Sequence, residues 1–254
     1  MKEFDSQVVV ITGGTSGIGK ATAKKFIDEG ATTVLLTADS KEIVDQALQE
    51  KAHAYILDVS NEQEVEKVFT QIVERFKKID VAFNNAGIGP DGKRIPYQSL
   101  VEVETSTWDK IVDVDLKGVF LCMKWELAQM IKQGHGAIVN TSSIGGYKMA
   151  PGFNAYGVAK AGVIALGQMA AIENAGKNIR VNTICPGPTQ GTQLTNNSFS
   201  VNPNEKEMLE SHVIPMKKLG LVEEVADAVL WLCSSKASHT TGQTLFIDGG
   251  MHIV

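Results

Sequence analysis

Short apolar runs, rich in β-branched residues, alternate along the chain with longer amphipathic stretches. Seven short runs are apolar nearly throughout, as strands covered on both faces must be: Gln7–Ile11, Thr33–Thr37, His53–Leu57, Val81–Asn84, Ala137–Thr141, Arg180–Cys185 and Thr244–Asp248. Six stretches have helical periodicity: Gly17–Glu29, Lys41–Glu50, Glu62–Phe76, Thr107–Ile131, Ala155–Gly176 and Glu223–Ser234. This alternation predicts an α/β fold with a doubly wound, seven-stranded parallel sheet and helices on both faces.

The 254 residues are compatible with two small domains or one large one. No internal repeat, low-complexity tract or linker divides the sequence, so residues 1–254 are expected to form a single domain. The only long polar interval is Thr189–Pro215. In a compact domain such an interval is more often a functional lid than a boundary, and we expect a substrate lid at about 189–215.

Composition and charge exclude several classes of partner. The formal net charge is −5, and the basic residues are scattered among acids, so no nucleic-acid partner is expected. Three distant cysteines indicate neither a disulfide framework nor a zinc site, and the five histidines share no metal-ligand spacing. The first apolar run is too short for a signal peptide or a membrane span, which favours a cytoplasmic protein without a membrane partner.

A glycine-rich turn connects the first predicted strand to the first predicted helix. Glycines allow positive φ and let backbone N–H groups approach a diphosphate at the positive end of the helix dipole. The spacing Gly13-x-x-x-Gly17-x-Gly19, with Ser16 and Ile18 inside it, differs from G-x-G-x-x-G but serves the same purpose. A glycine cluster alone marks many ordinary turns, whereas this position between strand and helix indicates dinucleotide binding.

Two further segments follow predicted strands and fall at the same edge of the sheet. Asp58 and Val59 end the third strand, and Asn85, Ala86 and Gly87 follow the fourth. Each segment alone is more commonly an Asx turn or a helix cap. Because ligands bind outside the carboxyl ends of parallel strands, together with the glycine turn they favour one cofactor site.

Tyr156 and Lys160 are spaced i, i+4 and therefore share one face of a predicted helix. An unperturbed tyrosine has a pKa of about 10, and a neighbouring ammonium favours the phenolate, which would make Tyr156 a usable acid/base. Ser143, at the end of the preceding strand, can donate a hydrogen bond to a reacting oxygen. A Tyr–Lys pair at this spacing arises by chance in about a third of such chains, but requiring the Ser lowers that figure to about two per cent.

The chain resembles the single-domain branch of the short-chain dehydrogenase/reductase family, which has a Rossmann fold. The matching segments run from end to end: Thr12–Gly19, Asn84–Gly87, Ser143 with Tyr156 and Lys160, Pro186-Gly187, and Asp248-Gly249-Gly250. The resemblance implies a nicotinamide-dependent oxidoreductase that interconverts a secondary alcohol and a ketone. In it Tyr156 is the acid/base, Lys160 lowers the pKa of Tyr156 and holds the cofactor ribose, and Ser143 orients the substrate. The turn Pro186, Gly187 to Thr189 would border the nicotinamide.

Asp115 departs from the family pattern. The family has V-N-L-K-G, with an Asn that relays protons through a water, where this chain has Val114-Asp115-Leu116-Lys117-Gly118. A carboxylate keeps an acceptor but loses the amide donor. The resemblance places Asp115 in the catalytic set beside Lys160, and we expect activity to tolerate the change.

The cofactor and the oligomeric state follow from further positions. Asp39 follows the second strand and no Arg or Lys occupies 37–40, which favours NAD over NADP, although Lys41 could reach a 2′-phosphate. The long helices Thr107–Ile131 and Ala155–Gly176 are apolar on more than one face, which together with the resemblance predicts a homotetramer. The apolar positions concerned include Met123, Trp125, Leu127, Val163, Leu166 and Met169.

Two other functions remain open at this point. A dinucleotide-binding regulator or scaffold with impaired turnover would fit the change at Asp115, but the intact Ser143, Tyr156 and Lys160 oppose it. A sugar-nucleotide epimerase can share Tyr-x-x-x-Lys, but it usually needs a longer C-terminal portion. The absence of G-x-S-x-G excludes an esterase-type nucleophile elbow.

Overall fold

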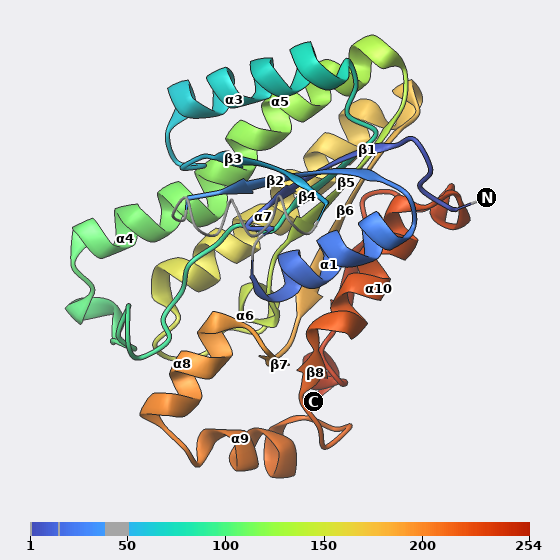
Figure 1. Cartoon of the computed structure of the whole chain (residues 1–254). Helices are drawn as coiled ribbons and strands as arrows, with labels where there is room; N and C mark the ends of the chain where they lie inside the picture. The colour runs from blue at the N-terminus through green and yellow to red at the C-terminus, as the bar shows by residue number, and fades with distance from the viewer. Residues whose placement is uncertain (1, 15, 39–50) are drawn as a thin grey trace.

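A computed structural model describes residues 2–14, 16–38 and 51–254. Within these residues seven parallel strands form one sheet in the order β3-β2-β1-β4-β5-β6-β9 (Figure 1). The strands are β1 (Val8–Thr12), β2 (Thr32–Thr37), β3 (His53–Ile56), β4 (Val81–Asn84), β5 (Gly136–Thr141), β6 (Ile179–Pro186) and β9 (Thr244–Ile247). The predicted fold class is confirmed, and each predicted strand boundary is correct to within one residue. The strand order reverses between β1 and β4, where a doubly wound sheet binds its ligand.

Helices cover both faces of the sheet, and each face has its own apolar core. On one face lie α1 (Gly17–Asp28) and α10 (Val222–Cys233), and on the other lie α3 (Glu62–Phe76), α5 (Gly118–Gln133) and α7 (Asn154–Asn174) (Figure 1). Alternate residues of one strand feed the two cores. Val8 and Val10 of β1 pack beneath α3, α5 and α7, whereas Val9 and Ile11 pack against α1 and α10. This double burial explains why the strands read as continuous apolar runs.

The predicted helix Thr107–Ile131 is confirmed as one helical stretch, but a π-helical turn, which the sequence did not predict, divides it into two α-helices. It consists of α4 (Thr105–Val112), a π-helical turn (Asp113–Lys117) and α5. The π-turn carries Asp115, whose side chain is completely buried. Turns of this kind are frequent at functional sites, because the extra residue reorients a side chain without ending the helix. The predicted helix Lys41–Glu50 lies outside the described residues.

The polar interval Thr189–Pro215 is largely helical. It contains β7 (Thr189–Gln190), α8 (Gln193–Val201), α9 (Glu205–Met208) and a π-turn (Leu209–Val213), and β7 pairs with β8 (Gly220–Leu221). In Figure 1, α8 and α9 project beyond the sheet on the side where β7 lies. The buried positions of α8 are Thr195 and Ser198, which are polar, so no apolar periodicity marks the helix in the sequence. A short helix, α6 (Ile144–Tyr147), follows β5.

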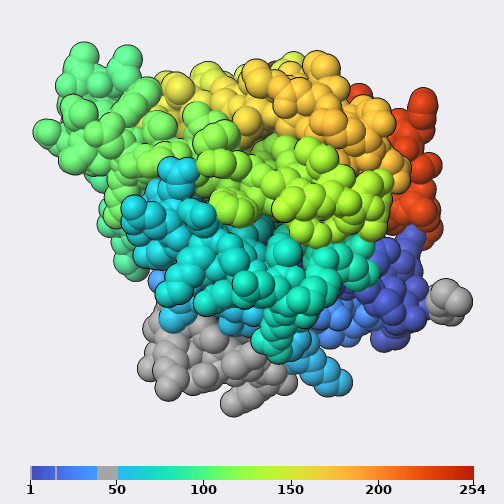
Figure 2. Space-filling model, turned by 90° about the horizontal axis from the view of Figure 1, so that it is seen from above, coloured from blue at the N-terminus to red at the C-terminus, as the bar shows by residue number. Residues whose placement is uncertain are grey.

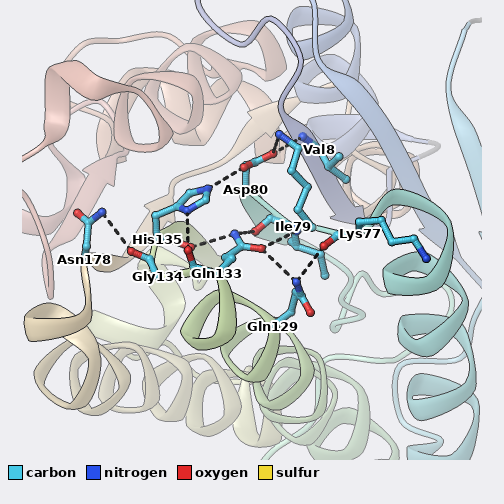
Figure 3. Close-up of polar contacts among 10 residues, drawn as sticks. Val8, Lys77, Ile79, Asp80, Gln129, Gln133, Gly134, His135 and Asn178 are labelled. Carbon is cyan, nitrogen blue, oxygen red and sulfur yellow. Dashed lines mark hydrogen bonds and ion pairs between the residues drawn. The ribbon is translucent and has the colours of Figure 1, made fainter.

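A hydrogen-bond network closes the opposite edge of the sheet, at the amino ends of β1 and β4 (Figure 3). The carboxylate of Asp80 accepts the backbone N–H of Val8 at 2.7 Å and lies 2.8 Å from the ammonium of Lys78. His135 Nε2 lies 2.9 Å from the other carboxylate oxygen. The side chain of Gln133 donates to the carbonyl of Ile79 at 2.7 Å, which ties the end of α5 to the start of β4. This network connects segments up to 72 residues apart in the sequence.

By length and composition alone, α7 with the turn that follows it could cross a membrane. In the structure α7 packs along β6 and β5, and its apolar residues Val163, Ala170 and Ala171 belong to the core on that face. This packing is that of a core helix in an α/β domain.

Candidate active site

The turn after β1 can be made only with glycine at several positions. Gly13 and Gly17 have φ values of +64° and +49°, which side chains disfavour. A Cβ on Gly19 would lie 2.2 Å from the carbonyl oxygen of Gly13. The chain therefore passes close to itself and leads directly into the N-terminus of α1, where backbone N–H groups are available for a diphosphate.

The hydroxyl of Thr12 joins the glycine turn to the segment after β4. Its oxygen accepts the backbone N–H groups of Asn85 at 2.9 Å and Ala86 at 3.0 Å. The Asn85 amide in turn donates to the carbonyl of Gly13 at 3.4 Å. A Cβ on Gly13 would lie 3.1 Å from Cα of Ala86, so the two segments lie in close contact. The predicted convergence of these segments at one edge of the sheet is confirmed.

A cavity of about 490 Å³ opens along this edge and brings together most of the predicted site. It is lined by the predicted catalytic residues Ser143, Tyr156, Lys160 and Asp115, and by the predicted cofactor residues Ser16, Gly17, Ile18, Asn85, Gly87, Pro186, Gly187 and Thr189. Gly13, Gly19 and Ala86 shape the turn behind this lining. The glycine cradle, the free end of α1 and the Pro186–Thr189 turn fit a dinucleotide that reaches from the turn toward Tyr156.

Besides Gly13, Gly19 and Ala86, two described residues of the predicted cofactor set, Asp58 and Val59, are not part of this lining. Asp58 is exposed, and its carboxylate accepts the backbone N–H of Ser60 at 2.9 Å in the turn before α3. Val59 is buried, and its side chain fills the space where a Cβ on Gly118 would lie. Their contact with the cofactor stays a prediction. Asp39 lies outside the described residues.

Lys160 and Ser143, which both interact with Tyr156, are held in place by hydrogen bonds. The Lys160 ammonium donates to the carbonyl of Thr141 at 3.2 Å and lies 5.7 Å from the centre of the Tyr156 ring. Ser143 caps α6, where its hydroxyl accepts the backbone N–H of Gly145 at 3.1 Å. A Cβ on Gly146 would lie 2.6 Å from the carbonyl carbon of Lys160, so α6 packs tightly against α7. The i, i+4 pair and the serine therefore share one site, as predicted.

Asp115 lies beside Lys160, which confirms the placement expected from the sequence. Its Oδ1 accepts the backbone N–H of Ile88 at 2.7 Å, and its Oδ2 lies 3.2 Å from Nζ of Lys160. Within the described part of the chain, Oδ2 receives no hydrogen bond. A Cβ on Gly87 would lie 3.1 Å from the Lys160 ammonium and 3.2 Å from Asp115 Oδ2, so glycine is needed there for the ion pair to form.

The pKa of Tyr156 is raised above its ordinary value, whereas the sequence predicted a lowering by Lys160. Burial of the phenol outweighs the lowering by the Lys160 charge and by a hydrogen bond with Ser143, and the Asp115 charge raises the pKa further. Burial alone would lower the pKa of Lys160, but Asp115 and Tyr156 raise it above its ordinary value. Burial also raises the pKa of Asp115, against the effect of Lys160. The lowering by Lys160 is therefore present as predicted, but burial outweighs it in the net pKa of Tyr156.

Several residues that line or support the cavity were not singled out in the sequence. Asp91 lies in loop 88–97, and Ser198 and Glu205 lie in segment 189–215. Asp91 contacts Asn197, 106 residues away, and Ser198 contacts Tyr97, 101 residues away, whereas Glu205 contacts Ser198, only seven residues before it. No short-range spacing marks them. Cys185 is buried near the site, and burial raises its pKa to about 11, so it is a protonated thiol rather than a nucleophile. Among the described residues, no three His, Cys, Asp or Glu side chains are grouped to hold a metal ion.

Fold and site together define a dinucleotide-dependent α/β oxidoreductase. A family model described as enoyl-(acyl carrier protein) reductase matches residues 13–252. The 3-oxoacyl-[acyl-carrier-protein] reductase FabG of Thermotoga maritima is 39% identical over 256 residues, covering 98% of this chain and 99% of that protein. Levodione reductase of Leifsonia aquatica is 37% identical over 257 residues, covering 97% and 94%.

Solved structures give the same result. The crystal structure of levodione reductase superposes with a TM-score of 0.90 at 35% identity, covering 98% of each chain. That of NAD⁺-bound xylitol dehydrogenase has a TM-score of 0.90 at 30% identity, covering 98% of this chain and all of the other. The chain belongs to the short-chain dehydrogenase/reductase family and is an NAD(P)-dependent oxidoreductase. These relationships do not favour the regulator without turnover.

Proposed function

We propose that this protein catalyses the interconversion of a secondary alcohol and its ketone, with Tyr156 as the acid/base. The observation that carries the proposal is the meeting of Tyr156, Lys160 and Ser143 in one cavity with the glycine turn. These groups can bind a carbonyl or carbinol oxygen and exchange one proton with it. The fold alone would not support this conclusion, because function belongs to the site rather than to the fold.

In alcohol oxidation, the substrate hydroxyl lies between Ser143 and Tyr156. Ser143 donates a hydrogen bond that orients the oxygen, and the phenolate of Tyr156 accepts the hydroxyl proton. In ketone reduction, Tyr156 returns a proton to the carbonyl oxygen. The bound nicotinamide supplies or accepts the hydride at the adjacent carbon. The Lys160 ammonium stabilises the phenolate and is held for this role by Thr141 and Asp115.

Asp115 is proposed to position the site rather than to react. Its carboxylate fixes the backbone at Ile88, at one wall of the cavity, and anchors the Lys160 ammonium. It also increases the negative potential around Tyr156, which opposes formation of the phenolate. The substitution of the family's Asn by Asp should therefore change the pH dependence of the reaction more than its maximal rate.

NAD is proposed as the working cofactor, in preference to NADP. The sequence places Asp39 and no Arg or Lys at 37–40, and a carboxylate there would accept hydrogen bonds from the ribose and repel a phosphate. The test compares kcat/KM for the two cofactors with one working substrate. A higher value with NADP would contradict the proposal. Asp39→Ala should weaken NAD binding by about 1–2 kcal/mol, as expected for a lost hydrogen bond to a charged group.

A homotetramer is proposed from exposed apolar side chains on two neighbouring helices. Phe120 and Ile131 of α5 and Val158, Met169 and Ile172 of α7 are each more than two-fifths exposed. Figure 2 shows the face on which α3, α5 and α7 lie in succession. Of the positions named from the sequence, Met123 and Val163 are buried in the chain's own core, whereas Met169 is available for a second subunit. Light scattering should give four times 27.3 kDa, and the mass of a monomer would contradict the proposal.

A cytoplasmic location is proposed from the composition, because the three cysteines lie far apart in the sequence and indicate no disulfide framework. Fractionation of cells that make the protein at its natural level would test it. Recovery of the protein in the membrane or secreted fraction would contradict this proposal.

The decisive experiment is cofactor turnover with a panel of secondary alcohols and ketones. Absorbance of the reduced nicotinamide should change with at least one substrate and should not change with Tyr156→Phe. Tight NAD binding without turnover of any substrate would instead favour the dinucleotide-binding regulator. Interconversion of sugar nucleotides without net cofactor reduction would indicate an epimerase.

A further inference from the structure

The wall of the cavity formed by loop 88–97 and the lid is fixed by a buried aspartate. Asp91 is inaccessible to solvent, and its Oδ2 accepts the side-chain amide of Asn197 at 2.8 Å and Nε of Arg94 at 2.7 Å. Burial alone would raise the pKa of Asp91, but these hydrogen bonds hold it well below its ordinary range. Nη1 of Arg94 also donates to Gln193 Oε1 at 3.0 Å. Helix α8 is thereby held against loop 88–97 before any substrate arrives.

A chain of three hydrogen-bonding groups lies in this wall. The hydroxyls of Tyr97 and Ser198 are 2.9 Å apart, and the hydroxyl of Ser198 donates to Oε2 of Glu205 at 2.5 Å. A carboxylate can only accept, and a serine hydroxyl has one proton. Because Ser198 gives its proton to Glu205, the proton between Tyr97 and Ser198 must come from Tyr97. Burial and the charges of Glu205 and Asp91 raise the pKa of Tyr97 despite its hydrogen bond with Ser198, which keeps this donor protonated.

This direction of donation leaves only acceptors for a ligand. The hydroxyl protons of Tyr97 and Ser198 are both used in these two hydrogen bonds. Oε1 of Glu205 and the remaining lone pair of the Tyr97 oxygen can therefore bind only a donor. Among the described residues, only Ser198 donates a hydrogen bond to the Glu205 carboxylate. Glu205, Ser198 and Tyr97 all line the same cavity as Tyr156. A ligand that enters this cavity with a hydroxyl at its far end would satisfy the free acceptors.

Two successive ring contacts connect Tyr97 with the proposed proton-transfer group. The ring of Tyr97 is 6.2 Å from that of Phe153, which is 5.9 Å from that of Tyr156. We take this donor to be a hydroxyl, because the hydroxyl of Ser198 already donates to the other oxygen of the Glu205 carboxylate. A cationic amine is the alternative donor, and the test below distinguishes the two.

We propose that Glu205 is a specificity-determining residue that accepts a hydrogen bond from a second hydroxyl group of the substrate, remote from the reacting carbon. The inference rests on the proposed alcohol–ketone reaction and narrows its substrates to neutral polyhydroxy compounds. An aliphatic alcohol without a second hydroxyl offers no donor to Oε1 of Glu205, and an anionic substrate is repelled by the carboxylate.

The test compares neutral C4–C6 polyols with secondary mono-alcohols of the same carbon skeleton, and with hydroxy acids and amino alcohols. Wild-type kcat/KM should be at least about tenfold higher for the polyols, and Glu205→Gln should remove about tenfold from the polyols while leaving the mono-alcohols within about threefold. Glu205→Ala should have a larger effect in the same direction. Glu207→Gln, on the exposed side of α9, is the matched control and should change neither series.

Binding provides a readout that does not depend on turnover. Calorimetric titration of a polyol into the NAD-saturated enzyme should show an affinity that Glu205→Gln lowers by about tenfold. Equal losses for polyols and mono-alcohols in this variant, or no loss, would overturn the inference, as would the absence of polyol binding to the wild type. A preference for hydroxy acids would mean that Arg94 recognises an anionic group of the substrate. A preference for amino alcohols would mean that the site recognises a cationic group. Either result would overturn the inference. Turnover of mono-alcohols without polyol binding would refute the inference about Glu205 but not the proposed reaction. Glu205-dependent polyol binding without any turnover would support the inference about Glu205 and refute the proposed reaction.

Discussion

Asp115 and Asp80 lie at opposite edges of the same sheet, and each has a lysine ammonium beside its carboxylate, at 3.2 and 2.8 Å. Their surroundings differ. Asp80 also accepts a backbone N–H and contacts His135, so both of its oxygens are occupied, and these partners lower its pKa although burial alone would raise it. Asp115 is more deeply buried, one of its oxygens receives no hydrogen bond, and burial raises its pKa despite Lys160.

This difference indicates that Asp80 contributes mainly to stability, whereas Asp115 influences the chemistry of the site. A carboxylate whose oxygens are all hydrogen-bonded is stable in its charged form and joins distant segments, as Asp80 does at the amino ends of the strands (Figure 3). An incompletely satisfied carboxylate next to a buried ammonium perturbs the groups around it, and such perturbed groups are concentrated at functional sites. Substitutions at the two edges should therefore affect different measurements.

The largest effect on activity is expected from Tyr156→Phe, in the site at the carboxyl ends of the strands. Only the transferable proton is removed, so kcat should fall by about 10²–10⁴-fold while the Kd for the cofactor stays within about threefold. The measurement is steady-state turnover together with cofactor titration. Turnover within threefold of the wild type would contradict the proposed acid/base role.

Lys160→Met should affect both activity and stability. Removing the ammonium leaves Asp115 buried and unpaired, which should lower the free energy of unfolding by about 3–5 kcal/mol. Cofactor affinity should fall as well. Adding Asp115→Asn to this variant should restore much of the stability but not the activity, as measured by denaturant unfolding. Lys117→Met, at an exposed pair with Asp113, is the control. Equal destabilisation by both lysine variants would contradict the account.

Glu126 of α5 is another buried carboxyl. It accepts the side-chain amide of Asn84 at 2.9 Å, and burial raises its pKa to about 8. Because the folded protein keeps this proton while the unfolded chain loses it near pH 4.5, stability should decrease as the pH rises from 4.5 to 8. Glu126→Gln should remove this decrease and raise the free energy of unfolding at pH 8 by about 4 kcal/mol.

The control for Glu126→Gln is the same comparison at pH 4.5, where the two proteins should have nearly equal stability. A constant difference at both pH values would mean that the substitution changes packing rather than ionisation.

Asp80→Asn tests the contribution of the hydrogen-bond network at the amino ends of β1 and β4. The lowered pKa of Asp80 means that its stabilisation is present above its ordinary value of 3.8 and is lost as the pH falls through the folded value. The variant should lose about 1–3 kcal/mol of unfolding free energy at pH 7 and keep the wild-type kcat. Asp227→Asn, at an exposed pair with Lys25, should have little effect on either. A loss of kcat in Asp80→Asn without a loss of stability would contradict the comparison.

Most of the fold could be predicted because strands that are buried on both faces appear in the sequence as continuous apolar runs. The strand Val8–Thr12 is apolar at nearly every position, and the turn after it needs glycine for steric reasons. Helix α8 could not be predicted in this way, because its inward positions Thr195 and Ser198 are polar. The π-turn at Asp113–Lys117 keeps the helical pattern and so cannot be distinguished from an α-helix by periodicity.

The membership of the site was more predictable than its electrostatics. Spacing placed Tyr156 with Lys160, and the family resemblance placed Asp115 beside them. The sequence does not give the depth of burial, and burial is the largest influence on the pKa of Tyr156. Asp91 was missed because its partner Asn197 lies 106 residues away, and no local rule connects the two.

The pH dependence of alcohol oxidation by Asp115→Asn tests whether the Asp115 charge controls the ionisation of Tyr156. The reaction requires the Tyr156 phenolate, and the Asp115 charge raises the pKa of that group. Removing the charge should move the acid limb of the kcat profile to lower pH, with a plateau equal to or above that of the wild type. Asp113→Asn, on the exposed side of the same π-turn, should leave the profile unchanged. An acid limb that stays in place or moves to higher pH, or a loss of activity at every pH, would contradict the account.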